Sequence, residues 1–228
     1  MSNLGERVTH TGTDLSGCDL KFISKAKSHT FPIMQQTIEK NIYREFLVYV
    51  GRINQFTRVD WMVYVLWIGL MVGLFLATTS FVVLGHKNGI VWPAYVWNVP
   101  LGTFIFCVAI AIDTIGHRTI YKKELQKGEQ LVHHITIFAG ISSVLLLCLA
   151  YHAPVFFKIP SAVLIGVSIL YSVLDEAMHW HRYFSIQSDR VEMWSHVFIL
   201  IGHMIMIFSW WTWFAEGYPG VQQTLAFL

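Results

Sequence analysis

The chain has 228 residues, of which 54% are hydrophobic and 13% are charged, and it contains nine tryptophans. This composition excludes an ordinary water-soluble domain and indicates a protein whose solvent is lipid. The formal net charge of +2 gives no basis for nucleic-acid binding, so we expect no nucleic acid among its partners.

The N-terminal part of the chain divides into two segments. Residues 1–31 are polar and rich in Gly, Ser and Thr, which predicts a flexible cytoplasmic arm. In residues 32–59, apolar side chains at Ile38, Ile42, Phe46 and Val50 recur at every fourth position, with charged residues between them. This spacing predicts an amphipathic helix that either lies on the membrane surface or packs over the end of a helix bundle.

Residues 60–228 contain five apolar stretches close to the length that crosses a bilayer core, about 20 residues. They cover residues 61–84, 96–115, 132–153, 160–177 and 193–214. The sequence therefore predicts an all-α, multi-pass integral membrane protein with five transmembrane helices. In a bacterium, its membrane would be the plasma membrane.

The basic residues predict the orientation of these helices. Fourteen Lys and Arg residues lie on the side of the spans that holds the N-terminus, and only Lys87 and Lys158 lie on the other side. Because basic residues are retained in the cytoplasm, we expect a cytoplasmic N-terminus and an external C-terminal segment. Arg118 and Arg182 fit the basic side, and the alternative is that they bind a phosphate headgroup.

Each of the last four spans carries, at its cytoplasmic end, a carboxylate followed four residues later by a histidine. The four pairs are Asp113–His117, Glu129–His133, Asp175–His179 and Glu192–His196. Residues four apart share one helix face, so each carboxylate and its histidine can converge on one point. Ionisable residues inside spans cost roughly 2.5–3.5 kcal/mol each near mid-helix, and they normally face the bundle interior for a functional reason.

The four pairs also form a repeat. The two Asp pairs are 62 residues apart and the two Glu pairs are 63 residues apart. This offset predicts that the second and third spans form one hairpin and that the fourth and fifth spans form its duplicate. Together they would make a four-helix bundle of the kind that holds two metal ions between its helices.

The predicted metal ligands are these pairs and several neighbouring side chains. They are Asp113, His117, Glu129, His133, His134, Glu176, His179, His181, Glu192, His196 and His203, with Asp175 assigned a catalytic or orienting role. Glu176 and His179 also have the Glu-x-x-His spacing of di-iron carboxylate bundles. Carboxylate and imidazole ligands without thiolates favour two iron ions, with zinc or manganese as alternatives. The alternative to a metal site is a structural network of polar groups that satisfy one another.

A redox metal pair at the membrane boundary can receive a lipophilic substrate from the bilayer and electrons from a soluble or membrane-bound donor. The sequence therefore predicts an oxygen-dependent oxidoreductase that hydroxylates, desaturates or oxidises a lipid or another lipophilic molecule at the cytoplasmic face. Two alternatives stay open. They are a membrane zinc hydrolase that cleaves a lipid amide or ester and a b-type cytochrome that carries electrons.

Overall fold

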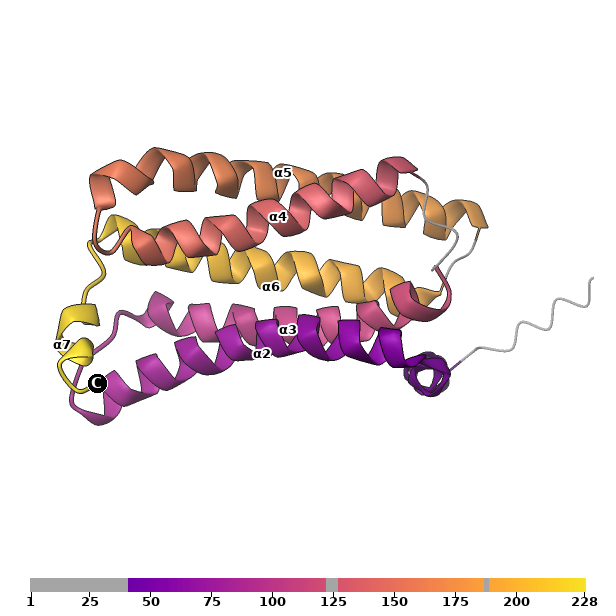
Figure 1. Ribbon diagram of the computed structural model, residues 1–228, viewed down its shortest axis with the longest axis horizontal. Helices are drawn as coiled ribbons and strands as arrows, with labels where there is room; N and C mark the ends of the chain where they lie inside the picture. Colours follow the sequence, from indigo (N-terminus) through magenta and orange to yellow (C-terminus); the bar gives the residue numbers. More distant parts are fainter. Residues whose placement is uncertain (1–40, 122–126, 187–188) are drawn as a thin grey trace, which may run out of the picture. The chain divides into compact units, whose positions relative to one another are not determined.

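The computed structural model describes residues 41–121, 127–186 and 189–228 (Figure 1). Over these residues it contains helices and no strands. In chain order the helices are α1 (Ile42–Gly51), η1 (Arg52–Gln55), α2 (Arg58–Lys87), η2 (Ala94–Trp97), α3 (Asn98–Thr119), α4 (Lys127–Leu149), α5 (Pro154–Ile186), α6 (Arg190–Ala215) and α7 (Val221–Leu225), where η marks a 3-10 helix. The predicted arm at residues 1–31, and residues 32–40 of the predicted amphipathic helix, lie outside the described residues.

Five helices, α2 to α6, are long and apolar enough to cross a membrane, which confirms the predicted number of spans. The largest difference from the predicted boundaries is in α5, which begins at Pro154 and continues past Pro160 to Ile186. A proline at the first helical position costs little, because its missing N–H would have no partner there. The turn expected between the third and fourth spans is correspondingly short.

Two glycines set the close packing of α3 against α6. A Cβ atom on Gly102 of α3 would lie 2.5 Å from the backbone nitrogen of Met206 and 2.7 Å from the carbonyl oxygen of Gly202. A Cβ atom on Gly202 of α6 would lie 2.6 Å from the backbone nitrogen of Phe106. Small residues at a crossing let helix backbones approach in lipid, where van der Waals packing holds helices together.

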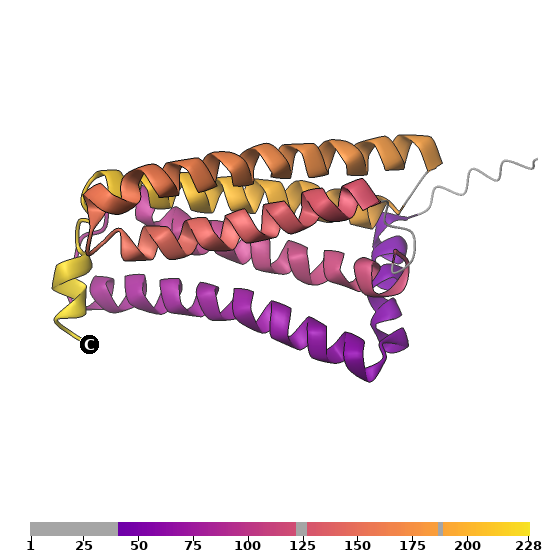
Figure 2. The same ribbon diagram turned by 45° about the horizontal axis from the view of Figure 1, so that its top comes forward.

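Small residues also line α4 and α5, which form the other extensively packed pair. Ser143 of α4 and Ser161 and Ser168 of α5 are completely buried. Among the described residues, the consecutive helices α3 and α4 are not closely packed. The bundle therefore joins α3 to α6 and α4 to α5, while α2 packs on α3 at the edge of the bundle (Figure 2).

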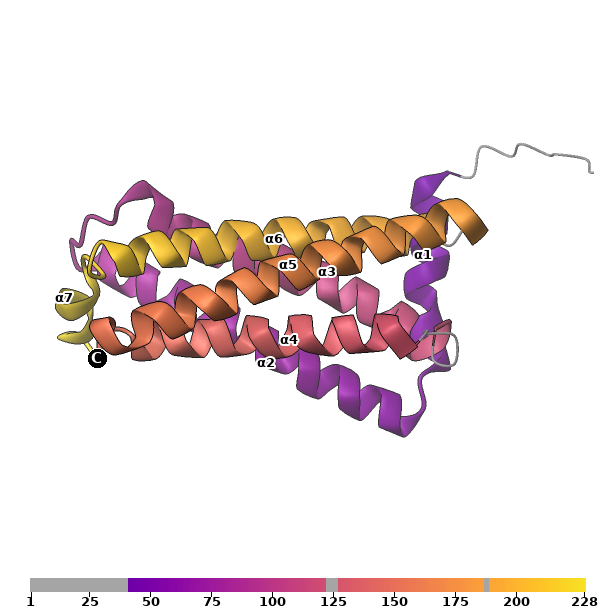
Figure 3. The ribbon, with the colours of Figure 1, turned by 90° about the horizontal axis from the view of Figure 1, so that it is seen from above.

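The α1 helix crosses the end of the bundle where α3 and α5 end and where α4 and α6 begin (Figure 3). Arg190 Nε of α6 donates a hydrogen bond of 2.8 Å to Glu45 Oε2, and Arg52 Nη1 donates one of 2.6 Å to Asp189 Oδ2. Tyr49 of α1 is completely buried. Within the described part of residues 32–59, α1 thus packs over the bundle end.

The predicted amphipathic helix does not continue to residue 59. The α1 helix ends at Gly51, and α2 begins after Thr57, whose side chain accepts a hydrogen bond from the backbone N–H of Asp60. The Asp60 carboxylate in turn accepts a bond from the backbone N–H of Thr57, which completes a capping box. Asp60 also accepts hydrogen bonds of 2.9 and 2.5 Å from Arg118, so the start of α2 is fixed to the end of α3.

Aromatic residues close the opposite end of the bundle. Trp92 Nε1 donates to the carbonyl oxygen of Val82 at 2.8 Å, and Tyr218, at the end of the chain near α7, donates to the carbonyl oxygen of Leu147. Within the described ranges, the group of histidines able to share a metal ion lies at the α1 end and not here.

Candidate metal centre

Four helices bring carboxylates and histidines together near the α1 end. The pairs are Asp113 and His117 of α3, Glu129 and His133 of α4, Asp175 and His179 of α5, and Glu192 and His196 of α6. All four carboxylates are buried. Burying a charge costs several kcal/mol unless a partner compensates it, so the contacts of these groups determine what the site can do.

One group centres on Asp113. Its Oδ1 lies 3.0 Å from His196 Nε2, and its Oδ2 lies 3.3 Å from His117 Nε2. Both are ion-pair contacts, and by its geometry neither histidine nitrogen has a hydrogen-bond partner among the described residues. Ligand atoms about 2.1 Å from one ion lie roughly 3.0–3.4 Å from each other, so this spacing suits a shared ion.

A second group centres on Asp175. Its Oδ2 lies 3.3 Å from His133 Nδ1, and its Oδ1 lies 3.8 Å from His179 Nε2. The two groups adjoin each other, since His196 Nδ1 lies 4.0 Å from Asp175 Oδ2. In addition, His117, His179 and His196 each offer a ligand atom within 4.8 Å of the other two.

Many polar atoms in this cluster are unsatisfied. Over the described ranges, the buried atoms here that have no hydrogen-bond partner are Asp113 Oδ1, Asp175 Oδ1, Glu192 Oε2, Arg182 Nε, Tyr49 Oη and the Nε2 atoms of His117, His179 and His196. Folded proteins bond nearly all their buried polar groups, and a concentration of exceptions needs an explanation. The carboxylate oxygen and imidazole nitrogen atoms among them are the kinds of ligand that a metal ion takes.

Arg182 fills the other side of the cluster. Its Nη1 donates to Glu129 Oε1 at 2.6 Å, and its Nη2 donates to Glu192 Oε1 and lies 2.7 Å from His179 Nδ1. The guanidinium also lies 4.5 Å from the centre of the Tyr121 ring. Glu129 and Glu192, both predicted as metal ligands, are therefore bound to an internal cation.

This role of Arg182 was not predicted from the sequence, where the residue was assigned to the basic side of the membrane or to a phosphate headgroup. Arg182 follows His179 by three residues, and this spacing places it on the same helix face. That spacing, together with the surplus of carboxylates, is the signal that points to an internal ion pair. Arg118 is likewise engaged within the protein, through Asp60.

Two tyrosines outside the membrane-spanning helices lie against the site. Burial, followed by the negative charge of Asp113, raises the pKa of Tyr49 far above its usual value. Gly116 makes room for the Tyr49 hydroxyl, because a Cβ atom there would lie 2.1 Å from it. Burial and then the charge of Glu192 likewise raise the pKa of Tyr121, whose hydroxyl is hydrogen-bonded to Glu192. Both side chains are neutral phenols next to the carboxylates.

Three predicted ligands lie outside the cluster. Glu176 accepts a 2.7 Å hydrogen bond from Trp180 Nε1, so the Glu-x-x-His spacing does not bring it to His179. His134 is exposed, with Nδ1 2.7 Å from the carbonyl oxygen of Gln130, and His181 is exposed as well. The reason is geometric, because successive residues of an α-helix are rotated by about 100° and the neighbour of an inward residue faces elsewhere.

His203 is buried deeper in the bundle. Its Nε2 lies 3.4 Å from Ser168 Oγ, and its ring lies 6.2 Å from that of Phe106. It lines a cavity of about 530 Å³ that extends from the cluster between the helices.

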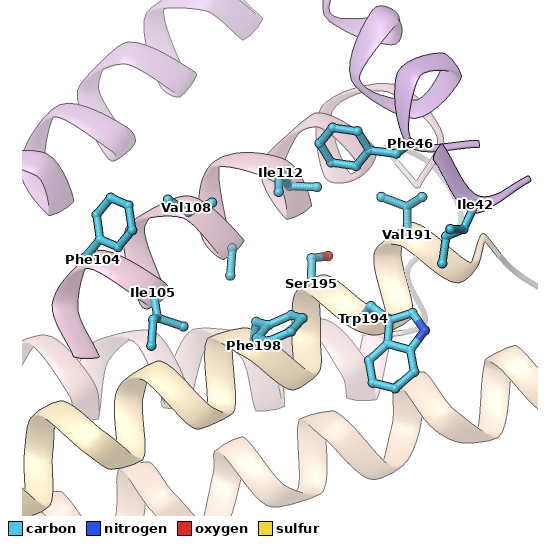
Figure 4. Close-up of a pocket in the computed structure, with 11 residues that line it drawn as sticks. Ile42, Phe46, Phe104, Ile105, Val108, Ile112, Val191, Trp194, Ser195 and Phe198 are labelled. Carbon is cyan, nitrogen blue, oxygen red and sulfur yellow. The ribbon is translucent and has the colours of Figure 1, made fainter. Parts of the chain in front are cut away.

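Another hollow, of about 630 Å³, lies on the outer face of α3 and α6 beneath α1 (Figure 4). Phe46, Phe104, Trp194 and Phe198 are prominent in its lining, and Ser195 is the one polar side chain among the described residues that form it. It has no titratable group, so we assign it no chemistry; it is a surface suited to hydrocarbon chains.

No family model, no curated protein and no solved structure matches this chain. Its function is therefore argued from the chemistry of the site.

Proposed function

We propose that this protein is a membrane-embedded di-iron oxidoreductase that uses oxygen to oxidise a lipid or another lipophilic molecule at the cytoplasmic face. The observation that carries the proposal is a pair of groups, each with two histidines around one buried aspartate. They are Asp113 with His117 and His196, and Asp175 with His133 and His179. Two histidines and one carboxylate are the ligand set of non-haem iron(II) oxygenases.

The sequence repeat supports one ion in each group. Under the repeat, Asp113 corresponds to Asp175, His117 to His179 and His196 to His133. The contact distances correspond as well. Within one helix, the distance is 3.3 Å from Asp113 to His117 and 3.8 Å from Asp175 to His179. Between helices, it is 3.0 Å from Asp113 to His196 and 3.3 Å from Asp175 to His133. The repeat relates α3 to α5 and α6 to α4, so the helix pair that holds the first group corresponds to the helix pair that holds the second. These correspondences support a duplicated hairpin around two equivalent sites.

The charges of the site also favour bound cations. Four buried carboxylates face one permanently charged side chain, Arg182, among the described residues of the cluster. Without metal, protons on the histidines or on the carboxylates themselves would have to balance them. The rings of His179 and His196 are stacked 3.4 Å apart, so charging both would place like charges in contact. Two divalent ions supply the positive charge without this repulsion.

Bound iron would supply the redox chemistry of such a centre. The residues of the chain would hold and shield it. Arg182 positions Glu129 and Glu192 beside the two groups, while Tyr49 and Tyr121 cover the α1 side as neutral hydrogen-bond and proton donors. A lipophilic substrate would reach the site from the membrane, and electrons would come from a soluble or membrane-bound donor.

Oxygen uptake tests the proposal. The detergent-purified protein is loaded with iron(II) under nitrogen and then mixed with oxygenated buffer. We expect oxygen consumption together with oxidation of protein-bound iron, faster than for the same concentration of iron(II) in buffer. The doubly substituted Asp113→Asn, Asp175→Asn protein serves as control and should behave like the buffer. Iron-loaded protein that stays reduced in oxygen would contradict an oxidoreductase.

One observation favours a second candidate, a zinc hydrolase acting on a lipid amide or ester. His117, His179 and His196 offer three ligand atoms within 4.8 Å of one another, and three histidines with a water molecule form a familiar catalytic zinc site. This candidate predicts one zinc ion per chain, no visible absorption and hydrolysis that stops when a chelator removes the metal.

A further inference from the structure

The cavity of about 530 Å³ connects the candidate metal centre with the interior of the bundle. At one end its lining includes Asp113, His117, His133, Asp175 and His196. Beyond them the lining is mainly apolar, with Trp67 of α2, Phe106 of α3 and Ile141 of α4 among its residues. Its volume lies within the range of about 300–1,000 Å³ that small-molecule sites occupy.

A second polar point lies deeper in this cavity. His203 follows His196 by seven residues on α6, which places it about 10 Å farther along the helix axis. His203 is only 5% exposed, and Ser168 beside it is completely buried. Ser168 Oγ and His203 Nε2 form a long hydrogen bond of 3.4 Å that orients the imidazole, and of the two only His203 keeps exposed surface for a contact with another molecule.

The cavity faces the membrane between α2 and α4. Leu70 of α2 and Leu145 of α4 both line it, and they are 54% and 58% exposed. In the described part of the chain, α2 packs on α3 and is not closely packed against α4. Side chains exposed in the middle of two spans face lipid, so a molecule dissolved in the bilayer can reach the cavity sideways.

The lining selects the charge of the occupant. Arg118 is the one permanently charged cation among the described lining residues, and Asp60 already binds it. A hydroxyl or carbonyl oxygen, in contrast, can bond to the imidazole of His203 without a charge being buried.

We propose that this cavity binds an uncharged, lipid-soluble substrate whose hydroxyl or carbonyl oxygen is hydrogen-bonded by His203, which Ser168 orients, and whose apolar body lies between α2 and α4. The occupant's role as substrate rests on the proposed function, whereas its binding does not. A quinone and a long-chain alcohol share this chemistry. His203 is then a substrate-binding residue and not a metal ligand.

Thermal unfolding of the purified protein tests the proposal with two probes, decylubiquinone and oleyl alcohol. A ligand that binds the folded protein raises its Tm. We expect a rise with at least one probe, and the probe that acts identifies the class of the oxygen group. Loss of the hydrogen bond to the probe in His203→Leu should weaken the apparent affinity about tenfold, and Ser168→Ala, which removes the contact that orients His203, should weaken it as well. Ser143→Ala, which alters another completely buried serine outside the cavity lining, should leave the affinity unchanged.

Metal analysis of the same samples separates this proposal from the proposed function. Ser168→Ala and His203→Leu should keep the metal content of the parent protein. Loss of metal in His203→Leu would overturn the assignment of His203, and no Tm change with either probe, or equal weakening by Ser168→Ala and Ser143→Ala, would overturn the cavity site. Probe binding by a protein that takes up no metal after loading would refute the metal centre and leave the cavity site intact.

Discussion

The nearest histidines of Asp113 and of Asp175 are in each case one on the same helix and one on another helix, and Asp175 also has His196 at 4.0 Å. The i to i+4 pattern in the sequence predicted the partners on the same helix. It did not predict that each aspartate would meet the histidine of a distant Glu-x3-His pair, because this depends on which helices pack together. Nor did it predict Arg182, since a search for metal ligands passes over cations.

The equivalence of the two groups leads to a prediction for His133 and His196. His133→Ala and His196→Ala should each remove about one of two bound ions, because each deletes one ligand of one group and leaves the other group intact. Elemental analysis of the purified variants measures this directly. His86→Ala, at the opposite end of α2, is the control and should retain all metal. Unchanged metal in both site variants would refute the assignment.

Arg182 leads to a second prediction at this scale. Arg182→Gln should destabilise the metal-free protein, because removing one partner of a buried ion pair costs roughly 3–5 kcal/mol. Metal ions would partly replace the lost charge next to Glu129 and Glu192. Added metal should therefore raise the Tm of Arg182→Gln more than that of the parent protein.

Arg118→Gln provides the comparison for Arg182→Gln. It breaks the ion pair with Asp60, so it should lower the Tm as well. Added metal should raise its Tm by the same amount as that of the parent protein. Equal metal responses of both variants would show that Arg182 is only structural.

The existence of α2 to α6 was predictable because a bilayer requires long apolar stretches, which stand out in any chain. Their ends were less predictable. The predicted fourth span began at Pro160, yet α5 begins at Pro154, and the polar residues after Asp175 continue the helix to Ile186. Glu176, His134 and His181 carried the right chemistry, but the helix phase set by their neighbours turns them away from the cluster.

The crossing of α3 and α6 leads to a prediction at the scale of elements. Gly102→Val should separate the two helices and displace Asp113 from His196, because its Cβ would overlap the backbone of α6. Overpacking of this kind costs roughly 1–3 kcal/mol, so we expect a lower Tm and weaker metal binding. Gly73→Val is the matched control on α2, where a Cβ atom meets nothing within 4 Å. Equal Tm values for the two variants would contradict the packing described here.

At the scale of the whole molecule, the candidate site, α1 and the starts of α2, α4 and α6 all lie at one end of the bundle (Figure 1). The basic residues predict that this end is cytoplasmic. The sequence could place the carboxylates and histidines at one depth. It could not predict that α3 packs against α6, because the positions of glycines and serines do not show which helices pack together.

Fluorescent-protein fusions in a bacterium test this orientation, since the reporter becomes fluorescent in the cytoplasm and not after export in unfolded form. A fusion after Leu228 should be dark, and a fusion after Ile186, at the end of α5, should be bright. The reverse pattern would place the candidate site outside the cytoplasm.

The central claim is that two metal ions bind between α3, α4, α5 and α6. Elemental analysis of the detergent-purified protein, combined with an optical spectrum before and after dithionite, tests it most directly. We predict close to two iron ions per chain, absorption that dithionite bleaches and no Soret band. Protein that binds no metal after loading would contradict the claim and reduce the cluster to a structural polar network.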